Sequence, residues 1–326
     1  MQVIELKRRA EKLLNLQTVS MLTTLHEYKI EQNKGILREY TKGKLSETRI
    51  IQSTEAFSVF SCFAIDTDRL KKLALDKTLP KTREEQEIAG FRDLLKVIDE
   101  NYAFIPLKSG QVQQLHKGLY QYVSSAAGGQ FQNAEKAKLL DGLCEKYESG
   151  LAEAVDPLLM IPMFILDFLA LCPFNEGNEP MSGLLALLLL YRAGYLVGEY
   201  ISIGRQVENT QKEYRKALEK HLRGRGKSAE SDQSFVQYLF KILKAAYEEF
   251  FERVRGYEAE CSKPEQIREL IKNTSGTVTK SAILQSCPGV SLVTVQRTLN
   301  ELVKSGAIEK IGGGRYTQYI WKEKEE

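Results

Sequence analysis

Two of the most apolar runs in the chain lie on either side of one turn-rich loop. The runs cover residues 157–170 and 184–191, and the loop between them is rich in Pro, Asn and Gly. These residue types tolerate the fixed or left-handed backbone angles that loops need. The first run contains Pro162 and Asp167 and is short for a membrane span, so both runs are expected to be buried helices. The chain is therefore expected to fold around two buried helices joined by this loop.

The loop leads directly into the N-terminus of the second expected helix. The N–H groups of a first helical turn have no backbone partner, and the helix dipole favours negative charge there. A loop in this position is therefore a candidate anion site. The backbone alone does not select a ligand, so the interpretation depends on the side chains.

Several residues of this region stand in a pattern known from one protein family. In chain order they are Asp167, Phe168, Pro173, Phe174, Glu176, Gly177, Asn178, Leu184 and Leu185. They resemble the signature H-P-F-x-[D/E]-G-N-G-R-x-x-R of Fic (Fido-fold) proteins with its flanks. The resemblance implies an all-helical core that moves AMP from ATP to a Ser, Thr or Tyr hydroxyl. It also implies that Glu176 holds Mg²⁺ and that Gly177 and Asn178 bind the nucleotide.

Four positions depart from that signature, and they are the positions that perform the family's chemistry. Cys172 stands at the histidine that serves as general base, Glu179 at the second glycine, and Pro180 and Gly183 at the two arginines. A carboxylate at a helix N-terminus repels phosphate and itself satisfies the dipole. Proline has no backbone N–H, and the missing arginines were the bidentate donors that suit phosphate. We interpret the loop as a self-capped helix start, the remnant of a nucleotide site.

Cys172 leaves one further chemistry open. A thiol in a loop beside a helix is a nucleophile when its pKa is depressed. No Lys or Arg close to it in the sequence replaces the lost arginines. An inert thiol is therefore the interpretation that we favour.

The inhibitory helix of many Fic proteins is also altered here. Counting back from the family-like residues 67–70 places Ser61 at the position of the inhibitory glutamate. In those proteins the inhibitory glutamate pairs with the second arginine of the signature. It has no function in this chain, where Gly183 stands at that arginine. Phe57, Phe60 and Phe63 are spaced three apart in this segment, which predicts that they pack one face of a helix.

The flap, a β-hairpin that docks the target segment in Fic proteins, is a third altered feature. Residues 128–133 resemble its start. The next helix is expected at Leu143, with only nine residues between it and Asn133, where family members have a longer insert. The hairpin is therefore expected to be shortened or deleted, which removes a docking strand for a protein substrate.

The last fifty residues change character. They predict a helix that ends at Ser286, a second helix from Ser291, and two alternating strands around the glycines 312–314. This order resembles the winged-helix tail of longer bacterial Fic proteins, in which the second helix is the recognition helix. The candidate DNA-contacting residues are Ser291, Thr294, Gln296, Arg297 and Asn300 on that helix, and Arg315 and Tyr316 on the wing. Residues 276–326 hold seven Lys or Arg against five Asp or Glu, a small excess for phosphate binding, so DNA and a protein both stay open as partners.

Two other features are interpreted as structural. His116 lies in a helical pattern without Cys, His or carboxylate at ligand spacing, so it is expected to pack in the fold or lie at the surface. Residues 223–228 form a basic, Gly-rich loop, but no strand precedes it and P-loop spacing is absent. We interpret this loop as a solvated connection between helices.

Composition indicates the cellular compartment of the protein but does not identify a binding partner. The 326 residues include 46 Lys or Arg and 43 Asp or Glu, and a net charge of +3 names no ligand. The five cysteines are odd in number and contain no C-x-x-C pair, which indicates a reducing compartment without a zinc module. The first residues lack the apolar core of a signal peptide. We therefore expect a cytoplasmic protein without membrane contact.

Together these observations predict a mainly α fold, a Fic-like helical bundle with a small C-terminal winged-helix domain of α+β type. The expected divisions are an N-terminal helical region with the degenerate inhibitory segment over residues 1–75, a Fic-like core over 76–205, a helical extension over 206–270 and the winged helix over 271–326. The predicted function is that of a pseudoenzyme that acts as a regulatory or binding protein without a cofactor. The alternative is an active adenylyltransferase that uses ATP and Mg²⁺, with Glu176 and Asn178 in their family roles and an unidentified base. A homodimer also stays open.

Overall fold

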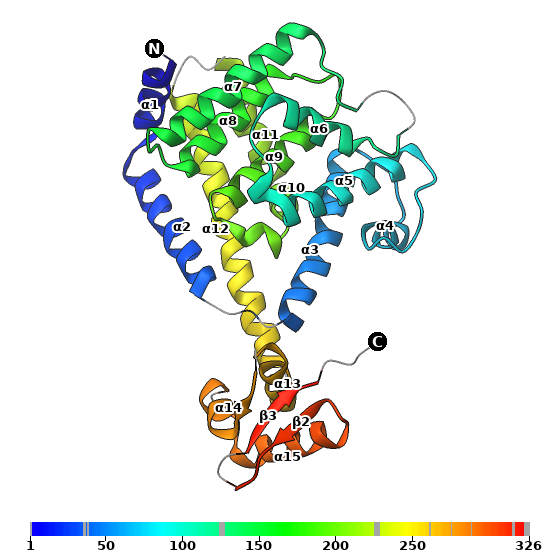
Figure 1. Cartoon of the computed structure of the whole chain (residues 1–326). Helices are drawn as coiled ribbons and strands as arrows, with labels where there is room; N and C mark the ends of the chain where they lie inside the picture. Colours follow the sequence, from blue (N-terminus) through cyan, green and yellow to red (C-terminus); the bar gives the residue numbers. More distant parts are fainter. Residues whose placement is uncertain are drawn as a thin grey trace. The chain divides into compact units, whose positions relative to one another are not determined.

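The computed structural model describes residues 2–34, 37, 39–123, 128–224, 229–260, 262–274, 276–287, 289–314 and 317–322. The chain divides into two compact units (Figure 1). The first unit, called the body below, comprises residues 1–36 and 44–251, and the second, called the tail unit, comprises residues 37–43 and 252–326. Each unit is described by itself.

The body is built from helices. In chain order its elements are α1 (Gln2–Leu13), α2 (Leu16–Lys34), α3 (Glu39–Phe60), α4 (Thr67–Ala74), α5 (Arg83–Asn101), η1 (Tyr102–Phe104), α6 (Ser109–Leu119), α7 (Ala134–Ala152), α8 (Pro157–Leu171), α9 (Asn178–Arg192), η2 (Leu196–Glu199), α10 (Ile203–Asn209), α11 (Gln211–Gly224) and α12 (Ala229–Glu260). The first residues of α3 and the last of α12 belong to the tail unit. In the described residues of the body, the only β pairing is an isolated bridge between Phe131 and Phe174.

Helices α8 and α9 form the centre of the body. Every residue of α8 from 158 to 166 is buried, which explains why this run is apolar on all sides. Pro157 occupies the first turn, where a missing N–H costs nothing, and the Asp156 carboxylate accepts a hydrogen bond from the Leu158 N–H at 2.8 Å. Helix α9 packs against α8, and α7 packs against another side of α8. The two buried helices predicted from the apolar runs are therefore confirmed.

The N-terminal helix α1 is anchored to this centre. It packs against α7 and α8, and its Ala10 and Leu13 are buried. Arg9 donates from Nη1 to the Asp167 carboxylate at 2.7 Å and from Nε to the Asp232 carboxylate at 2.6 Å. Arg9 thus finds its partners on α8 and α12, far away in sequence, while Lys7, Arg8, Glu11 and Lys12 of the same helix are exposed.

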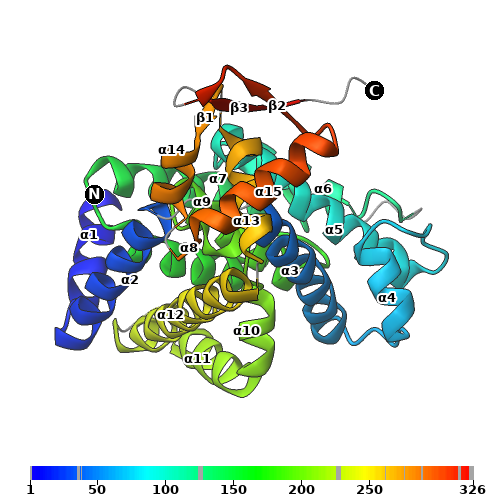
Figure 2. The same ribbon diagram turned by 90° about the horizontal axis from the view of Figure 1, so that it is seen from below.

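The tail unit combines three helices with a small sheet. Its elements are α13 (Lys263–Asn273), β1 (Val278–Thr279), α14 (Lys280–Ser286), α15 (Leu292–Lys304), β2 (Ile308–Ile311) and β3 (Gln318–Trp321). The strands are antiparallel in the order β1-β3-β2 (Figure 2), with Val278 opposite Tyr319 and Ile308 opposite Trp321. The unit has its own core, made of Ile267, Ile271, Val278, Ile283, Val295, Leu299, Ile308 and Tyr319 with their neighbours. The two helices and two strands expected here are present, and β1 adds a third strand.

No helix in the described part of the chain is long and apolar enough to span a membrane.

Candidate functional site

The loop between α8 and α9 begins with a left-handed residue. Helix α8 ends at Leu171, and Cys172 has φ 48° and ψ 64° while its N–H donates to the Phe168 carbonyl at 2.9 Å. The thiol is half-buried, and the Gln132 amide lies 3.7 Å from its Sγ. The Lys136 ammonium, which is distant in sequence, donates to the Leu171 carbonyl. The C-terminal end of α8 is thus contacted by Lys136 of α7 and by Gln132, which lies just before α7.

Asn178 closes the loop on itself. Its Oδ1 accepts a hydrogen bond from the Phe174 N–H at 3.0 Å, and its Nδ2 donates to the Phe174 carbonyl at 2.8 Å. The preceding Gly177 has φ 72°, and a Cβ at this position would lie 2.5 Å from the Tyr120 hydroxyl oxygen. Glycine is therefore required here by both conformation and space. Both polar atoms of Asn178 are used inside the loop.

His116, on α6, packs against the loop between α8 and α9. Its ring is fully buried and lies parallel to the ring of Phe174, with centroids 3.8 Å apart. Nδ1 accepts from the Gly129 N–H at 2.8 Å, which leaves Nε2 to donate to the Glu176 carbonyl at 3.0 Å. This pattern requires the neutral ring, and burial lowers the pKa of His116 below its ordinary value. The interpretation of His116 as a packing residue is confirmed, and its packing shapes the candidate site.

Glu176, the expected metal ligand, faces a cation. Its carboxylate lies 3.0 Å from Nη2 of Arg83, and Arg83 also contacts the Glu87 carboxylate at 2.9 Å. The Arg83–Glu176 pair is solvent-exposed on both sides. Among the described residues, no group of three or more His, Cys, Asp or Glu side chains is arranged to hold a metal ion. The arrangement at Glu176 is that of a surface ion pair.

The first turn of α9 carries a negative charge. Glu179 is exposed, and its backbone carbonyl accepts a hydrogen bond from the Ser182 hydroxyl at 2.7 Å. Burial, together with the charge of Glu179 and a hydrogen bond to it, raises the pKa of Tyr214 on α11. Gly183 is exposed as well, and a Cβ there would meet nothing within 4 Å. No side chain occupies the space that faces Gly183.

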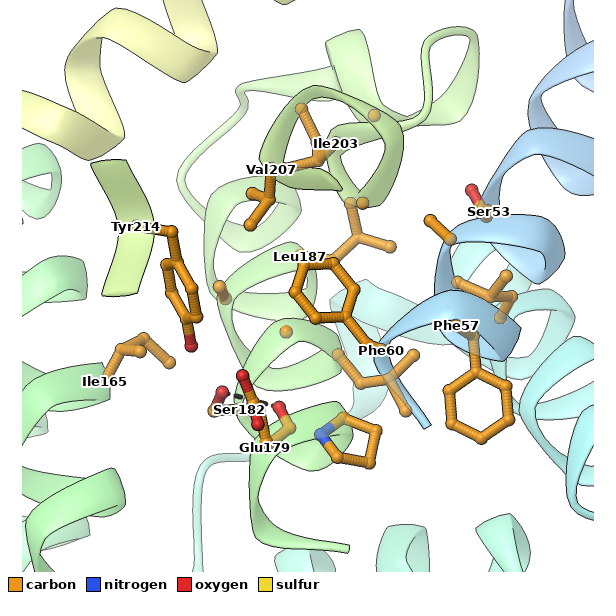
Figure 3. A pocket seen from close by; sticks show the side chains of 18 of the residues that line it. Ser53, Phe57, Phe60, Ile165, Glu179, Ser182, Leu187, Ile203, Val207 and Tyr214 are labelled. Atoms are coloured by element: carbon orange, nitrogen blue, oxygen red, sulfur yellow. Dashed lines mark hydrogen bonds between the residues drawn. The ribbon is translucent and has the colours of Figure 1, made fainter. Parts of the chain in front are cut away.

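A cavity of about 170 Å³ lies beside this turn (Figure 3). Its lining comes from α3, α5, α8, α9, η2, α10, α11 and α12, and includes Phe57, Phe60, Phe91, Glu179, Gly183, Leu187, Val207 and Tyr214. Phe57 stacks on Phe91 at 4.4 Å between centroids, and Phe60 meets Tyr214 edge-on at 6.2 Å. Aromatic rings of α3 thus line the space between α3 and α9.

The three phenylalanines predicted to share one helix face do not all lie on the helix. Helix α3 ends at Phe60, so Phe63 follows the turn at residues 61–62 and packs edge-on against Phe57 at 5.8 Å. Phe57 and Phe60 pack toward different partners, Phe91 and Tyr214. The prediction of apolar packing holds for all three residues, but the single face was wrong because the helix ends earlier.

The segment expected to begin the flap is short. The Gln132 N–H donates to the Pro173 carbonyl at 2.9 Å, and Phe131 pairs with Phe174 in the isolated bridge. Helix α7 then begins at Ala134, capped by the Asn133 side chain. The described residues 128–133 therefore contain no hairpin. They contact the loop between α8 and α9 directly. The helix expected from Leu143 begins nine residues earlier.

Known proteins resemble this chain in structure but not in sequence. No family model and no curated protein matches the chain. Among solved structures, a Fic family protein from Desulfovibrio desulfuricans has a TM-score of 0.59 at 16% identity and covers 96% of this chain and 98% of its own. A Fic domain containing signaling protein from Bacteroides thetaiotaomicron has a TM-score of 0.61 at 14% identity, covering 72% of this chain and 98% of its own. Fic-1 from C. elegans has a TM-score of 0.61 at 13% identity over 73% of each chain.

The chain has the Fic fold. At these identities the likeness concerns the fold alone. It confirms the predicted mainly α, Fic-like architecture, and the sheet and helices of the tail unit supply the expected small α+β part. The body's division at residues 75 and 205 stays a prediction.

Within the Fic fold, the predicted loop residues Cys172, Glu176, Gly177 and Asn178 lie together between α8 and α9. Sequence reasoning missed Arg83, His116 and Tyr214, which contact this loop and the turn after it from α5, α6 and α11. The contacting residues are at least 35 positions apart in the chain, and no local pattern indicates them.

The second predicted set lies on α15 in the tail unit. Ser291 caps the helix by accepting from the Thr294 N–H, and the two hydroxyls are 2.9 Å apart. Gln296, Arg297 and Asn300 are exposed; Gln296 accepts from Lys280 at 3.1 Å and Arg297 pairs with Glu301 at 3.0 Å. The wing candidates Arg315 and Tyr316 lie outside the described residues.

Proposed function

We propose that this chain is a Fic-type pseudoenzyme, a binding or regulatory protein that does not transfer nucleotide. The observation that carries the proposal is the start of α9, where Glu179 places a carboxylate and Gly183 carries no side chain at the position of a signature arginine. Residues 171–191 contain no Lys or Arg. A triphosphate carries several negative charges, so a site of this polarity repels it.

The remaining signature residues are occupied by contacts within the protein. Asn178 uses both polar side-chain atoms to close the loop. Glu176 pairs with Arg83, so a metal ion there would compete with a guanidinium. The fold family implies ATP and Mg²⁺, but these residues do not fit that pair, and we derive no step through it.

The general base and the docking strand of a transferase also have no evident replacement. Cys172 stands at the histidine position with its thiol near the Gln132 amide, and it has no carboxylate or imidazole among its hydrogen-bond partners in the described residues. The described segment 128–133 is bonded to Pro173 and Phe174 and offers no hairpin to a target chain. These features support a binding role over group transfer.

The exposed face of α15 supports the binding role. Leu292 is 56% exposed and Val293 is 77% exposed, side by side at the start of the helix. Arg297, further along the same helix, is paired with Glu301, and the neighbouring carboxylate opposes binding of a phosphate there. Apolar side chains and paired charges favour a protein partner for this winged-helix-like unit, with DNA as the alternative.

Incubation with ATP labelled at the α-phosphate, in the presence of Mg²⁺, tests the proposal. We expect no label on this protein or on proteins of a cell extract. A Glu176→Ala variant is the control, because a true transfer reaction by the family mechanism would be lost in it. Label that depends on Glu176 would establish the alternative, an active adenylyltransferase.

A further inference from the structure

We propose that the cavity beside the first turn of α9 binds a small, largely apolar molecule that carries an ammonium group. This inference concerns a ligand for the body itself. It does not rest on the loss of nucleotide transfer, because it depends on the size, lining and charge of the cavity alone.

The size of the cavity suits a molecule of one ring. Its volume is about 170 Å³. An apolar cavity of roughly 150 Å³ in another protein stays dry when empty and binds benzene. Unfilled cavities of this size destabilise a core, so a fold that keeps one leaves binding energy for an occupant. One ring with a short side arm fills the available space.

The walls of the cavity are apolar and partly aromatic. Phe57, Phe60, Leu187 and Val207 line it, and Figure 3 shows their side chains gathered around one space between α3, α9 and α10. The Phe57 ring is held in place by its stacking on Phe91. Aromatic faces attract both apolar groups and cations. The walls therefore select a ligand by its apolar part.

The polar end of the cavity is negative. Glu179 and Tyr214 both line it (Figure 3), and burial together with the charge of Glu179 raises the pKa of Tyr214. The lining includes only one cationic residue, Arg49. That guanidinium already donates to both Asp99 oxygens, at 2.7 and 2.9 Å, and to the Gly198 carbonyl at 2.8 Å. The hydrogen bonds of Arg49 are thus made within the protein. The charged group that remains for a ligand is the Glu179 carboxylate.

The cavity opens at the same end. Glu179 and Gly183 are the exposed members of the α9 lining, and the space around Gly183 is free for at least 4 Å. A ligand that enters with its ring first leaves its ammonium group beside Glu179. The ring is then desolvated while the charge keeps a partner and partial access to water, which is the favourable arrangement for an amphipathic cation.

Three probes of equal size test this inference in the full chain. Benzylamine, benzyl alcohol and benzoate share one ring and differ in charge, and their dissociation constants can be measured by ligand-detected NMR. We expect benzylamine to bind about fivefold tighter than benzyl alcohol, since a partly exposed ion pair adds about that factor. Benzoate should bind weakest. The Glu179→Gln variant should remove the preference for benzylamine.

A matched pair of glycine variants locates the binding. Gly183→Leu places a side chain at the mouth of the cavity and should weaken all three probes. Gly142→Leu is the control, because Gly142 is also exposed in a helix with nothing within 4 Å of its Cβ position, and it lies outside the cavity lining. Equal binding in the two variants, no binding of any probe, or benzoate binding as tightly as benzylamine would each overturn the proposal.

Discussion

The imidazole of His116 and the ring of Phe174 lie face to face, 3.8 Å apart between centroids and 9° from parallel. Phe174 belongs to the signature loop and His116 to α6, so this stack joins the loop to a second helix. The two ring nitrogens of His116 fix the Glu176 carbonyl and the Gly129 N–H at the same time. Contacts within the protein thus hold the conformation of the loop.

The state of His116 predicts how stability depends on pH. Burial lowers the pKa of His116 below 6.5, against the opposing effect of its hydrogen bond to Glu176. The unfolded chain, with an ordinary histidine pKa, then binds more protons than the folded chain below about pH 6.5. The stability that depends on neutral His116 is fully present above that pH and is lost as the pH falls through the folded-state pKa.

The measurement is urea unfolding of the wild type and of His116→Phe from about pH 7.5 to about pH 5. At neutral pH the variant should be less stable by about 2 kcal/mol, because it leaves two buried backbone groups unpaired. That difference should shrink as the pH falls. A difference that stays constant with pH would show that folding does not lower the pKa of His116.

Arg9 is expected to be one of the residues on which the body most depends. Its side chain is 17% exposed and bridges Asp167 to Asp232, and Asp232 is 2% exposed. Removing Arg9 takes away the ion-pair partner of Asp167 and leaves the buried Asp232 carboxylate with His221 as its remaining partner, and breaking a buried pair on one side is costly. Arg9→Met should therefore lower the free energy of unfolding by about 3 kcal/mol in denaturant titration.

Arg83→Met is the matched control for that change. Arg83 also pairs with two carboxylates, but it is 54% exposed, and exposed pairs contribute about 0–1 kcal/mol. Equal losses for the two variants would contradict the role given to Arg9 as an anchor of α1.

Local pattern predicted the parts of the fold that depend on local sequence. The apolar runs gave α8 and α9, and the break before Ser291 gave the start of α15, since Ser291 caps it. Strand β1 has two residues and exists through its pairing with β3, so its own sequence carries no signal. Such short strands are formed by tertiary contacts.

Of the candidate site, the sequence predicted only the residues of the loop between α8 and α9. A motif names residues that are adjacent in sequence, whereas Arg83 meets Glu176 across 93 residues of chain. His116 was set aside because it had no ligand-spaced partner, and its partners are backbone groups of Gly129 and Glu176. The cavity likewise depends on how α3, α9 and α11 pack, which the spacing of aromatic residues does not determine.

The charges on α15 predict weak DNA binding with a shallow salt dependence. The described cations on or beside its exposed face are Arg297, Lys304 and Lys280. Three phosphate contacts give a log–log slope of about −3 against salt concentration. Arg297→Ala should reduce the slope by about one, and Glu301→Gln, which frees Arg297, should strengthen binding. Fluorescence anisotropy with a random duplex measures both; a slope of about −6 or steeper would point to DNA as the natural partner.

Four substitutions are predicted to restore a nucleotide site. They are Cys172→His, Glu179→Gly, Pro180→Arg and Gly183→Arg. The structure has room for them, because Gly183 faces open space and Cys172 has the left-handed conformation that histidine tolerates better than most residues. The repaired protein should bind ATP with Mg²⁺ at micromolar strength. If it folds, as circular dichroism would show, and still binds none, the loop is not the remnant of a nucleotide site.

Calorimetric titration of the unmodified protein with ATP and Mg²⁺ tests the central claim most directly, with intact-mass analysis of the same sample and the repaired protein as positive control. We expect no heat of binding and no added AMP, because Glu179 opposes the phosphates and neither position of the arginine pair holds an arginine. Binding at micromolar strength or tighter, or any AMP adduct on the chain, would contradict the account and make Cys172 and Glu176 the first residues to change.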